Sequence, residues 1–288
     1  MIDLSKIRQI VGVGEVACIN HGNWSVCVDS HGAHVLGLFF KEKNILHYSA
    51  RDIAHSGIPI CLPNFGPLSN GVFQYQGTEF PIPQHGFFRD CSFQLIDKSC
   101  SSLSYQLNSS NETRQLFPFD FCFTVTFSLH DSGLKCVFSL TNNSKVCMPI
   151  APGIHPYYAA ATGDDVIFET RSDEANDNHQ LYLAVRLEDS LKSLVEDNSG
   201  VRKFRVVGNP DLHLKGHGLE TTQLKIGSNQ PLRITADLES FNRMTLWRKH
   251  ADSTFICLEP AYVKNGLNGQ PISIPSGEIW STVFKISH

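Results

Sequence analysis

The feature that most constrains the fold is a long series of short β-branched and aromatic segments separated by turn-forming residues. β-Branched and aromatic side chains favour strands because they pack well on a pleated surface. Several segments alternate apolar with polar residues, which is the period of a strand with one face in a core. The clearest segments are residues 24–28, 35–40, 121–129, 135–140, 166–170 and 232–236.

One pair of these segments predicts a β-hairpin. Residues 121–129 (FCFTVTFSL) and 135–140 (KCVFSL) flank the turn-forming tripeptide Asp131-Ser132-Gly133. The chain has no alternation of strands with crossover helices and no glycine fingerprint for a nucleotide. We therefore expect residues 1–288 to form one all-β domain, a large antiparallel β-sandwich.

Helical and loop signals are weak. Residues 181–195 form the best helical candidate, but without clear caps they predict a short helix or an irregular turn. The polar residues 171–180 (RSDEANDNHQ) predict an exposed loop.

Composition excludes several classes of partner. The formal net charge is -4, which offers no basic field for nucleic acid or an anionic membrane surface. No apolar run is long enough for a membrane-spanning helix. The amino terminus carries Asp3 and lacks a long apolar run, so it does not resemble a signal peptide, and a cytoplasmic location is expected.

The nine cysteines form no CxxC pair, and their number is odd. Most lie among strand-like neighbours, so we expect small buried apolar side chains rather than a disulfide framework or a zinc site. Their positions are Cys18, Cys27, Cys61, Cys91, Cys100, Cys122, Cys136, Cys147 and Cys257.

Three stretches place ionisable residues among prolines, glycines and aromatics, where burial shifts pKa values. They are residues 57–71 leading into 81–90 (PIPQHGFFRD), 151–158 (APGIHPYY) and 255–269 (FICLEPAYVKNGLNG). The candidate functional side chains are His85, Arg89, His155 and Glu259. Taken singly, each has an ordinary structural explanation, such as a turn histidine before proline or a glutamate at the end of a strand.

Other chemistries lack support in the sequence. His213 and His217 are four residues apart, but Gly216 and Gly218 argue against a helix there, so we interpret the pair as part of a loop. No HExxH or GxSxG motif occurs. The sequence predicts neither a metal site nor a cofactor.

In this order, the three stretches resemble the galactose mutarotase-like (aldose 1-epimerase) superfamily. HGFFRD resembles its first histidine motif, in which His-Gly is followed by an aromatic residue and Arg. GIHPYY resembles its second motif, His-Pro-Tyr-Phe. ICLEP, the loop after it and ISIPSGEIWSTVFKI resemble its glutamate block and last strands. HGAHVLGLFFKEKNILHYS resembles its opening strands, so the resemblance covers nearly the whole chain.

The segment GIPICLPNFGP before PIPQHGFFRD is most similar to the glucose-6-phosphate 1-epimerase-like branch. That branch has Arg-Gly-Gly where this chain has His55-Ser56-Gly57, so the cation best suited to a phosphate is replaced. Arg51 is a partial substitute in the sequence. We therefore expect an unphosphorylated aldohexose as the substrate, with a hexose 6-phosphate as the alternative.

The resemblance implies interconversion of the α and β anomers of a sugar without a cofactor. Glu259 would act as the base on O1 and His155 as the acid on O5, roles that a carboxylate and an imidazole can fill. His85, Arg89 and Asp211 would bind sugar hydroxyls or the ring oxygen. The expected aromatic wall consists of Phe87, Tyr157 and Trp247.

Two other functions remain open at this point. One is a non-catalytic carbohydrate-binding or regulatory protein on the same fold, because fold does not fix function. The other is a lyase or hydrolase, which would need a second carboxylate or a metal near Glu259.

Overall fold

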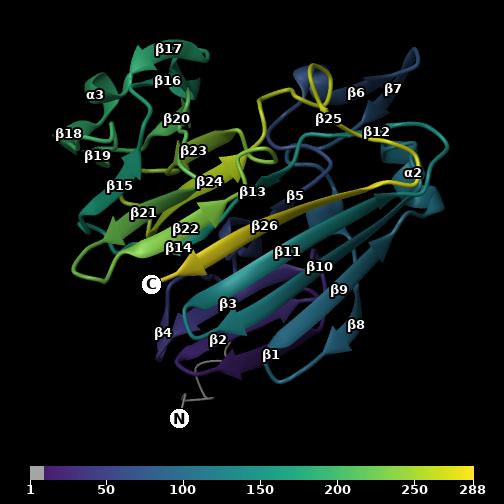
Figure 1. Ribbon diagram of the computed structural model, residues 1–288, viewed down its shortest axis with the longest axis horizontal. Coiled ribbons are helices and arrows are strands. Elements are labelled where there is room, and N and C mark those ends of the chain that lie inside the picture. Colours follow the sequence, from purple (N-terminus) through teal and green to yellow (C-terminus); the bar gives the residue numbers. More distant parts are fainter. Residues whose placement is uncertain (1–9) are drawn as a thin grey trace.

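The computed structural model describes residues 10–288, which form an assembly of antiparallel sheets (Figure 1). The amino-terminal segment around Asp3, on which the prediction about targeting rests, lies outside the described residues. Every pairing between the named strands is antiparallel, as predicted for a β-sandwich.

The largest sheet has ten strands. Its spatial order is β18 (Lys192–Glu196), β19 (Arg202–Arg205), β15 (Val166–Thr170), β21 (Thr221–Ile226), β22 (Leu232–Ala236), β26 (Ile279–Ser287), β11 (Gly133–Asn142), β10 (Phe121–His130), β9 (Ser102–Asn108) and β8 (Gln94–Lys98). The predicted hairpin is confirmed as β10 and β11, which pair from Phe121↔Asn142 to His130↔Gly133.

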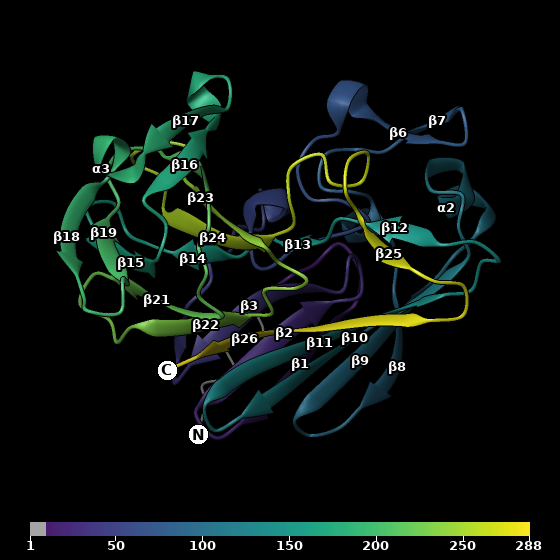
Figure 2. The same cartoon turned by 45° about the horizontal axis from the view of Figure 1, so that its top comes forward.

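A second sheet, of eight strands, carries the candidate site. Its order is β17 (Leu183–Arg186), β16 (Glu174–Asp177), β20 (Asp211–Leu214), β23 (Arg243–Trp247), β24 (Phe255–Ala261), β13 (Gly153–Ile154) and β5 (Ile60–Cys61), with β14 (Tyr157–Ala159) also paired to β24. Figure 2 shows β13 and β24 lying above the long strands of the ten-stranded sheet.

The remaining strands form smaller sheets. β1 (Val16–His21), β2 (Trp24–Asp29), β3 (His34–Phe40) and β4 (Lys43–Asn44) make one of four strands, whose first two strands contact β10. Two further pairs are β12 (Met148–Ile150) with β25 (Ile272–Ile274), and β6 (Val72–Tyr75) with β7 (Thr78–Pro81).

The core lies between these sheets, because apolar side chains alternate along their strands. β10 shows the pattern most clearly, since Phe121, Phe123, Val125 and Phe127 are buried and the residues between them are half-buried. One continuous apolar cluster runs from Ala17 to Ile286 and includes residues of all the larger sheets. The prediction of a single domain over residues 1–288 stays a prediction.

Two segments differ from their predicted form. Residues 171–180 were expected to be an exposed loop, but they contain β16 and the 3₁₀ turn Asn178–Gln180, and Ala175 and Asp177 are buried. A polar strand that pairs on both sides resembles a loop in sequence. Residues 181–195 do contain a short helix, α3 (Leu187–Ser190), between β17 and β18.

The expectation that the cysteines are unpaired is wrong for one pair. Cys18 and Cys27 lie directly opposite each other on β1 and β2 and form a disulfide. The pairing follows from strand register, which the spacing of cysteines does not reveal. Cys61, Cys136 and Cys257 are buried as expected, whereas Cys100 and Cys147 are exposed.

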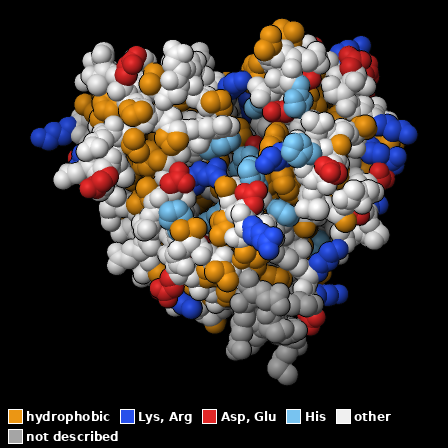
Figure 3. Space-filling model, turned by 180° about the vertical axis from the view of Figure 1, so that it is seen from behind, with side chains coloured by type: hydrophobic (Ala, Val, Ile, Leu, Met, Phe, Trp, Pro, Cys, Tyr) orange, Lys and Arg blue, Asp and Glu red, His pale blue; other side chains and the backbone are white. Residues whose placement is uncertain are grey.

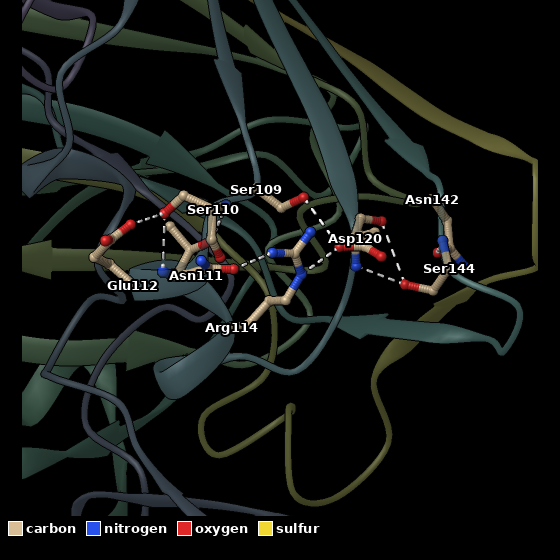
Figure 4. A network of polar contacts seen from close by, with 9 residues as sticks. Ser109, Ser110, Asn111, Glu112, Arg114, Asp120, Asn142 and Ser144 are labelled. Atoms are coloured by element: carbon tan, nitrogen blue, oxygen red, sulfur yellow. Dashed lines mark hydrogen bonds and ion pairs between the residues drawn. The ribbon is translucent and has the colours of Figure 1, made fainter.

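A polar network fixes the connection between β9 and β10 (Figure 4). Ser110 caps α2 (Asn111–Leu116) by accepting a hydrogen bond from the Thr113 amide. The Arg114 Nε donates to Asp120 at 2.6 Å, and the Asp120 amide donates to Ser144 Oγ at 2.7 Å. The network therefore joins α2 to the turn that follows β11.

On the face shown in Figure 3, basic and acidic side chains are interspersed, and histidines gather near its centre. Within residues 10–288, no helix is long and apolar enough to cross a membrane.

Because His34 is buried, we expect the folded protein to lose stability in acid. Its Nε2 contacts the Ser56 carbonyl at 2.8 Å, and burial lowers the pKa of His34 from 6.5 to about 4. Because the folded protein binds this proton less readily than the unfolded chain, the stabilisation is complete above pH 6.5 and decreases as the pH falls toward 4. We expect His34 alone to reduce the free energy of unfolding by about 3 kcal/mol over that range.

Urea unfolding from about pH 7 to about pH 4 measures this decrease. The His34→Gln variant keeps a nitrogen donor for the Ser56 carbonyl but takes up no proton, so its stability should depend less steeply on pH. Equal slopes in the parent and the variant would show that His34 does not control this acid sensitivity.

Candidate functional site

A cavity of about 280 Å³ lies over the eight-stranded sheet and brings together seven of the eight side chains predicted as site residues. Those that line it are His85, Arg89, His155, Tyr157, Asp211, Trp247 and Glu259. Its volume is slightly below the range of about 300–1,000 Å³ usual for drug-sized ligands, so it suits a small ligand. Phe87 is the predicted site residue that does not line the cavity.

His155 and Glu259 face each other because of the sheet register. β13 and β14 both pair with β24, through Gly153↔Ala261 and Tyr157↔Cys257, so His155 lies opposite Glu259. The His155 Nε2 and Glu259 Oε1 atoms are 3.3 Å apart, and both side chains are buried. The main chain therefore fixes the separation of the two groups.

Burial shifts the pKa values of this pair in opposite directions. Burial, with a smaller effect of Asp211, raises the pKa of Glu259 well above its usual range. Burial, with the nearby His85 and Arg89, lowers the pKa of His155 well below its usual range. Both shifts favour the uncharged forms, so we describe the contact as a carboxyl group beside a neutral imidazole, although the geometry alone fits an ion pair.

The HGFFRD stretch holds His85 and Arg89 through an unusual backbone. His85 has φ 68° and Gly86 has φ 73°, and a Cβ on Gly86 would lie 2.0 Å from the Leu62 carbonyl oxygen. The amides of Phe87 and Phe88 both donate to that same carbonyl. Glycine is therefore required after His85, and the turn directs the histidine into the cavity.

His85 and Arg89 are themselves positioned by main-chain groups. The His85 Nδ1 accepts a hydrogen bond from the Gly66 amide at 3.2 Å, and burial lowers the pKa of His85 to about 3. The Arg89 Nη2 donates to the Ala54 carbonyl at 3.1 Å. A neutral His85 beside a fixed guanidinium offers polar atoms at one end of the cavity.

The placement of Phe87 in the aromatic wall is wrong. Its side chain is only 3% exposed and packs against Phe88 in the main core, with ring centroids 5.2 Å apart. In the turn that leads into the 3₁₀ helix Phe88–Asp90, both aromatics point inward, which the sequence does not specify. Tyr157 and Trp247 do line the cavity, edge to face at 6.2 Å, and Phe65 joins them.

The interpretation of His213 as a loop residue is also wrong. Asp211 and His213 lie on β20 and face the cavity, whereas the alternate residues Leu212 and Leu214 are buried. The His213 ring contacts the Thr245 hydroxyl at 3.0 Å. The alternation of DLHL is a period-two signal that identifies this strand, although the glycines after it obscure it.

Three further cavity residues were missed as site residues. Asn178 donates to the Asp211 carboxylate at 3.0 Å and accepts from the Lys264 ammonium group at 3.3 Å. Lys264 also lies 3.9 Å from the centroid of the Tyr182 ring. Thr245 lines the floor beside Glu259, its partner in the ladder. They lie on segments whose polar residues give no separate signal.

His55-Ser56-Gly57 stands where the glucose-6-phosphate 1-epimerase-like branch has Arg-Gly-Gly. His55 lines the cavity, and its Nδ1 contacts the Asp52 carboxylate at 2.8 Å. The Asp52 carboxylate therefore offsets any positive charge on His55. Arg51, the substitute cation considered from the sequence, is exposed and is not part of the cavity lining.

Known proteins resemble this chain in sequence. The family model "Aldose 1-epimerase" matches residues 16–179. A candidate glucose-6-phosphate 1-epimerase of Salmonella typhimurium is 31% identical over 106 residues, which is 35% of this chain and 31% of that protein. The matched segment is thus about a third of the length of that relative.

Solved structures match nearly the whole chain. A galactose mutarotase-like protein from Lactobacillus casei has a TM-score of 0.76 at 20% identity, covering 95% of this chain and 99% of that one. The Slr1438 protein from Synechocystis has a TM-score of 0.82 at 19% identity, covering 96% of each. The fold is therefore galactose mutarotase-like, and the chain belongs to the aldose 1-epimerase family.

Proposed function

We propose that the protein is a mutarotase that interconverts the α and β anomers of an unphosphorylated aldohexose. The observation that carries this proposal is the contact between His155 and Glu259, 3.3 Å apart and buried at the base of a cavity of about 280 Å³. Ring opening needs one group to remove the O1 proton and another to protonate O5. This pair supplies both groups.

The shifted pKa values suit a pair that shares one proton. The directions of the two pKa shifts favour a proton on Glu259 beside a neutral His155 when no sugar is bound. Sugar hydroxyls that donate hydrogen bonds to the carboxylate would stabilise its charged form and so favour transfer of the proton to His155. Substrate binding would thus produce the carboxylate base and the imidazolium acid at the same time.

The proton movements then balance over one turnover. Glu259 accepts the O1 proton while His155 donates a proton to O5, and the C1–O5 bond breaks to give the open-chain aldehyde. After rotation about C1–C2, the O5 hydroxyl attacks the other face of the carbonyl. His155 recovers its proton from O5 and Glu259 returns its proton to O1, so the pair ends as it began.

Neighbouring side chains would bind and orient the sugar. Asp211, held by Asn178, accepts hydrogen bonds from hydroxyls, and Arg89 and Lys264 donate them. Trp247 and Tyr157 offer apolar surface to the C–H faces of the ring.

Polarimetry on freshly dissolved α-D-glucose and α-D-galactose tests the proposal, with and without the protein. A rate above the spontaneous mutarotation is the expected result. If no aldose is turned over although a sugar binds, the protein is the non-catalytic carbohydrate-binding protein that the same fold can form.

The cavity also gives a prediction about substrate charge. Because Asp52 offsets His55 and Arg51 lies outside the lining, we expect free hexose to be turned over at least as efficiently as its 6-phosphate. Polarimetry with glucose and glucose 6-phosphate compares kcat/KM for the two sugars. The competing function is that of the named relative, a glucose-6-phosphate 1-epimerase.

A large preference for the phosphate would contradict this prediction. In that case the cations that line the cavity, Arg89 and Lys264, would be the phosphate ligands. The Lys264→Met variant distinguishes the two outcomes, because it should then reduce turnover of the 6-phosphate more than turnover of the free sugar.

A further inference from the structure

A third ionisable side chain lies against the His155–Glu259 pair and has no part in the proposed proton transfer. Cys257 precedes Glu259 by two residues on β24, so the two side chains project from the same face of the strand. One ligand atom from each of His155, Cys257 and Glu259 lies within 4.8 Å of the others, and all three residues are buried. The sheet thus gathers a nitrogen, a sulfur and an oxygen donor.

Two of these side chains have unused donor or acceptor capacity. Within residues 10–288, the buried His155 Nδ1 has no hydrogen-bond partner, and the buried Glu259 Oε1 has no partner other than its 3.3 Å contact with His155 Nε2. The side chains are 7% and 2% exposed. Unsatisfied buried polar atoms are uncommon in folded proteins, and an unfilled ligand site is one explanation for them.

We propose that His155, Cys257 and Glu259 form a binding site for a thiophilic divalent cation of the zinc type, and that this ion inhibits the proposed mutarotase. Imidazole, thiolate and carboxylate are the ligands that zinc takes in proteins, at about 2.0–2.3 Å. Around a tetrahedral ion such donors stand roughly 3–4 Å apart, so small side-chain movements would bring the three donors of this group, which lie within 4.8 Å of one another, to that spacing. Magnesium and calcium prefer more oxygen ligands than this site offers.

The charge balance favours a divalent ion over a monovalent one. The ligands of a metal ion are deprotonated, so Cys257 would bind as a thiolate and Glu259 as a carboxylate. The protons displaced by the metal would pass to solvent, and the bound site would contain two anions, the Cys257 thiolate and the Glu259 carboxylate, beside a neutral His155. The dication neutralises them, so the buried site gains no net charge.

With this site, the metal and the sugar could not bind at the same time. The ion would bind the same two side chains, His155 and Glu259, that the sugar needs for proton transfer. Inhibition should therefore be relieved by sugar and reversed by a chelator. Because binding releases protons, the affinity for the metal should increase with pH.

The experiment uses the Cys100→Ser, Cys147→Ser protein as background, because those exposed thiols would bind the metal independently. Zn²⁺, Cd²⁺ and Mg²⁺ are added separately as the probes. One equivalent of Cd²⁺ should produce a thiolate-to-cadmium absorption band, with proton release measured by calorimetry in two buffers. Zn²⁺ should inhibit mutarotation, whereas Mg²⁺ should not.

The deciding variant is Cys257→Ala, with Cys257→Ser as a second replacement in case the first does not fold. Cys257 takes no part in the proposed proton transfer, so both variants should keep their activity without metal. The Zn²⁺ concentration that halves the activity should rise by at least about tenfold, and the cadmium band should disappear. Cys136→Ala, a second buried cysteine on β11, is the matched control and should retain both properties.

Metal binding and the proposed function can fail separately. The cadmium band and the proton release test the site even if the protein has no mutarotase activity. Unchanged Zn²⁺ inhibition or an unchanged cadmium band in the folded Cys257 variants would overturn the proposal. So would the absence of any band in the background protein.

Discussion

Replacing Glu259 by Gln or His155 by Asn is expected to lower the mutarotase kcat by about 10²–10⁴-fold in a protein that remains folded. Each replacement keeps most of the shape of its side chain but removes one proton-transfer group from the pair that the sheet holds 3.3 Å apart. Polarimetry at saturating sugar measures the loss, and circular dichroism confirms the fold. A folded Glu259→Gln protein with near-normal activity would place the base elsewhere.

The double variant tests whether the two residues act as one unit. If they exchange protons in one concerted step, the double variant should lose much less activity than the product of the two single losses. The pH profile of the parent should then be bell-shaped, and its limbs should describe the coupled pair rather than either residue. Multiplicative losses would indicate two independent groups.

The second large effect is expected at Phe88, which connects the core to the cavity. Its ring is fully buried and lies 5.0 Å from Phe121 and 5.3 Å from Phe123 on β10. Phe88→Ala should lower the free energy of unfolding by about 3–5 kcal/mol, measured by urea denaturation. Because Arg89 follows it on the same 3₁₀ helix, kcat/KM should fall as well.

A matched pair of variants separates these two effects. Phe127→Ala removes a similarly buried ring from the far end of β10 and should cost comparable stability without changing kcat/KM of the folded protein. Phe88→Leu should restore most of the stability. An equal loss of kcat/KM in Phe127→Ala would show that activity depends on overall stability rather than on the position of Arg89.

The strands and the main polar side chains were predictable from the sequence because their signals are local. Period-two alternation identified β10, β11, β15 and β22, since a strand with one buried face must alternate. The polar interruptions of strand-like sequence identified His155 and Glu259. Both signals depend only on neighbouring residues.

The missed features depend on how distant segments meet. Phe87 and Phe88 are identical in type, and only the turn conformation decides that neither ring reaches the cavity. Lys264 and Asn178 are brought together by the loop after β24 and the turn after β16. Cys18 and Cys27 meet through strand register. No local pattern encodes such contacts.

The left-handed backbone of His85 has a consequence for how this protein can evolve. A residue with a β-carbon in that conformation costs about 1–2 kcal/mol relative to glycine, and asparagine tolerates it better than most residues. Selection for thermal stability alone would therefore favour Gly or Asn at position 85, at the expense of an imidazole in the cavity. Lineages that keep His85 would be those in which the cavity still binds its ligand. At this position, stability and ligand binding therefore favour different residues.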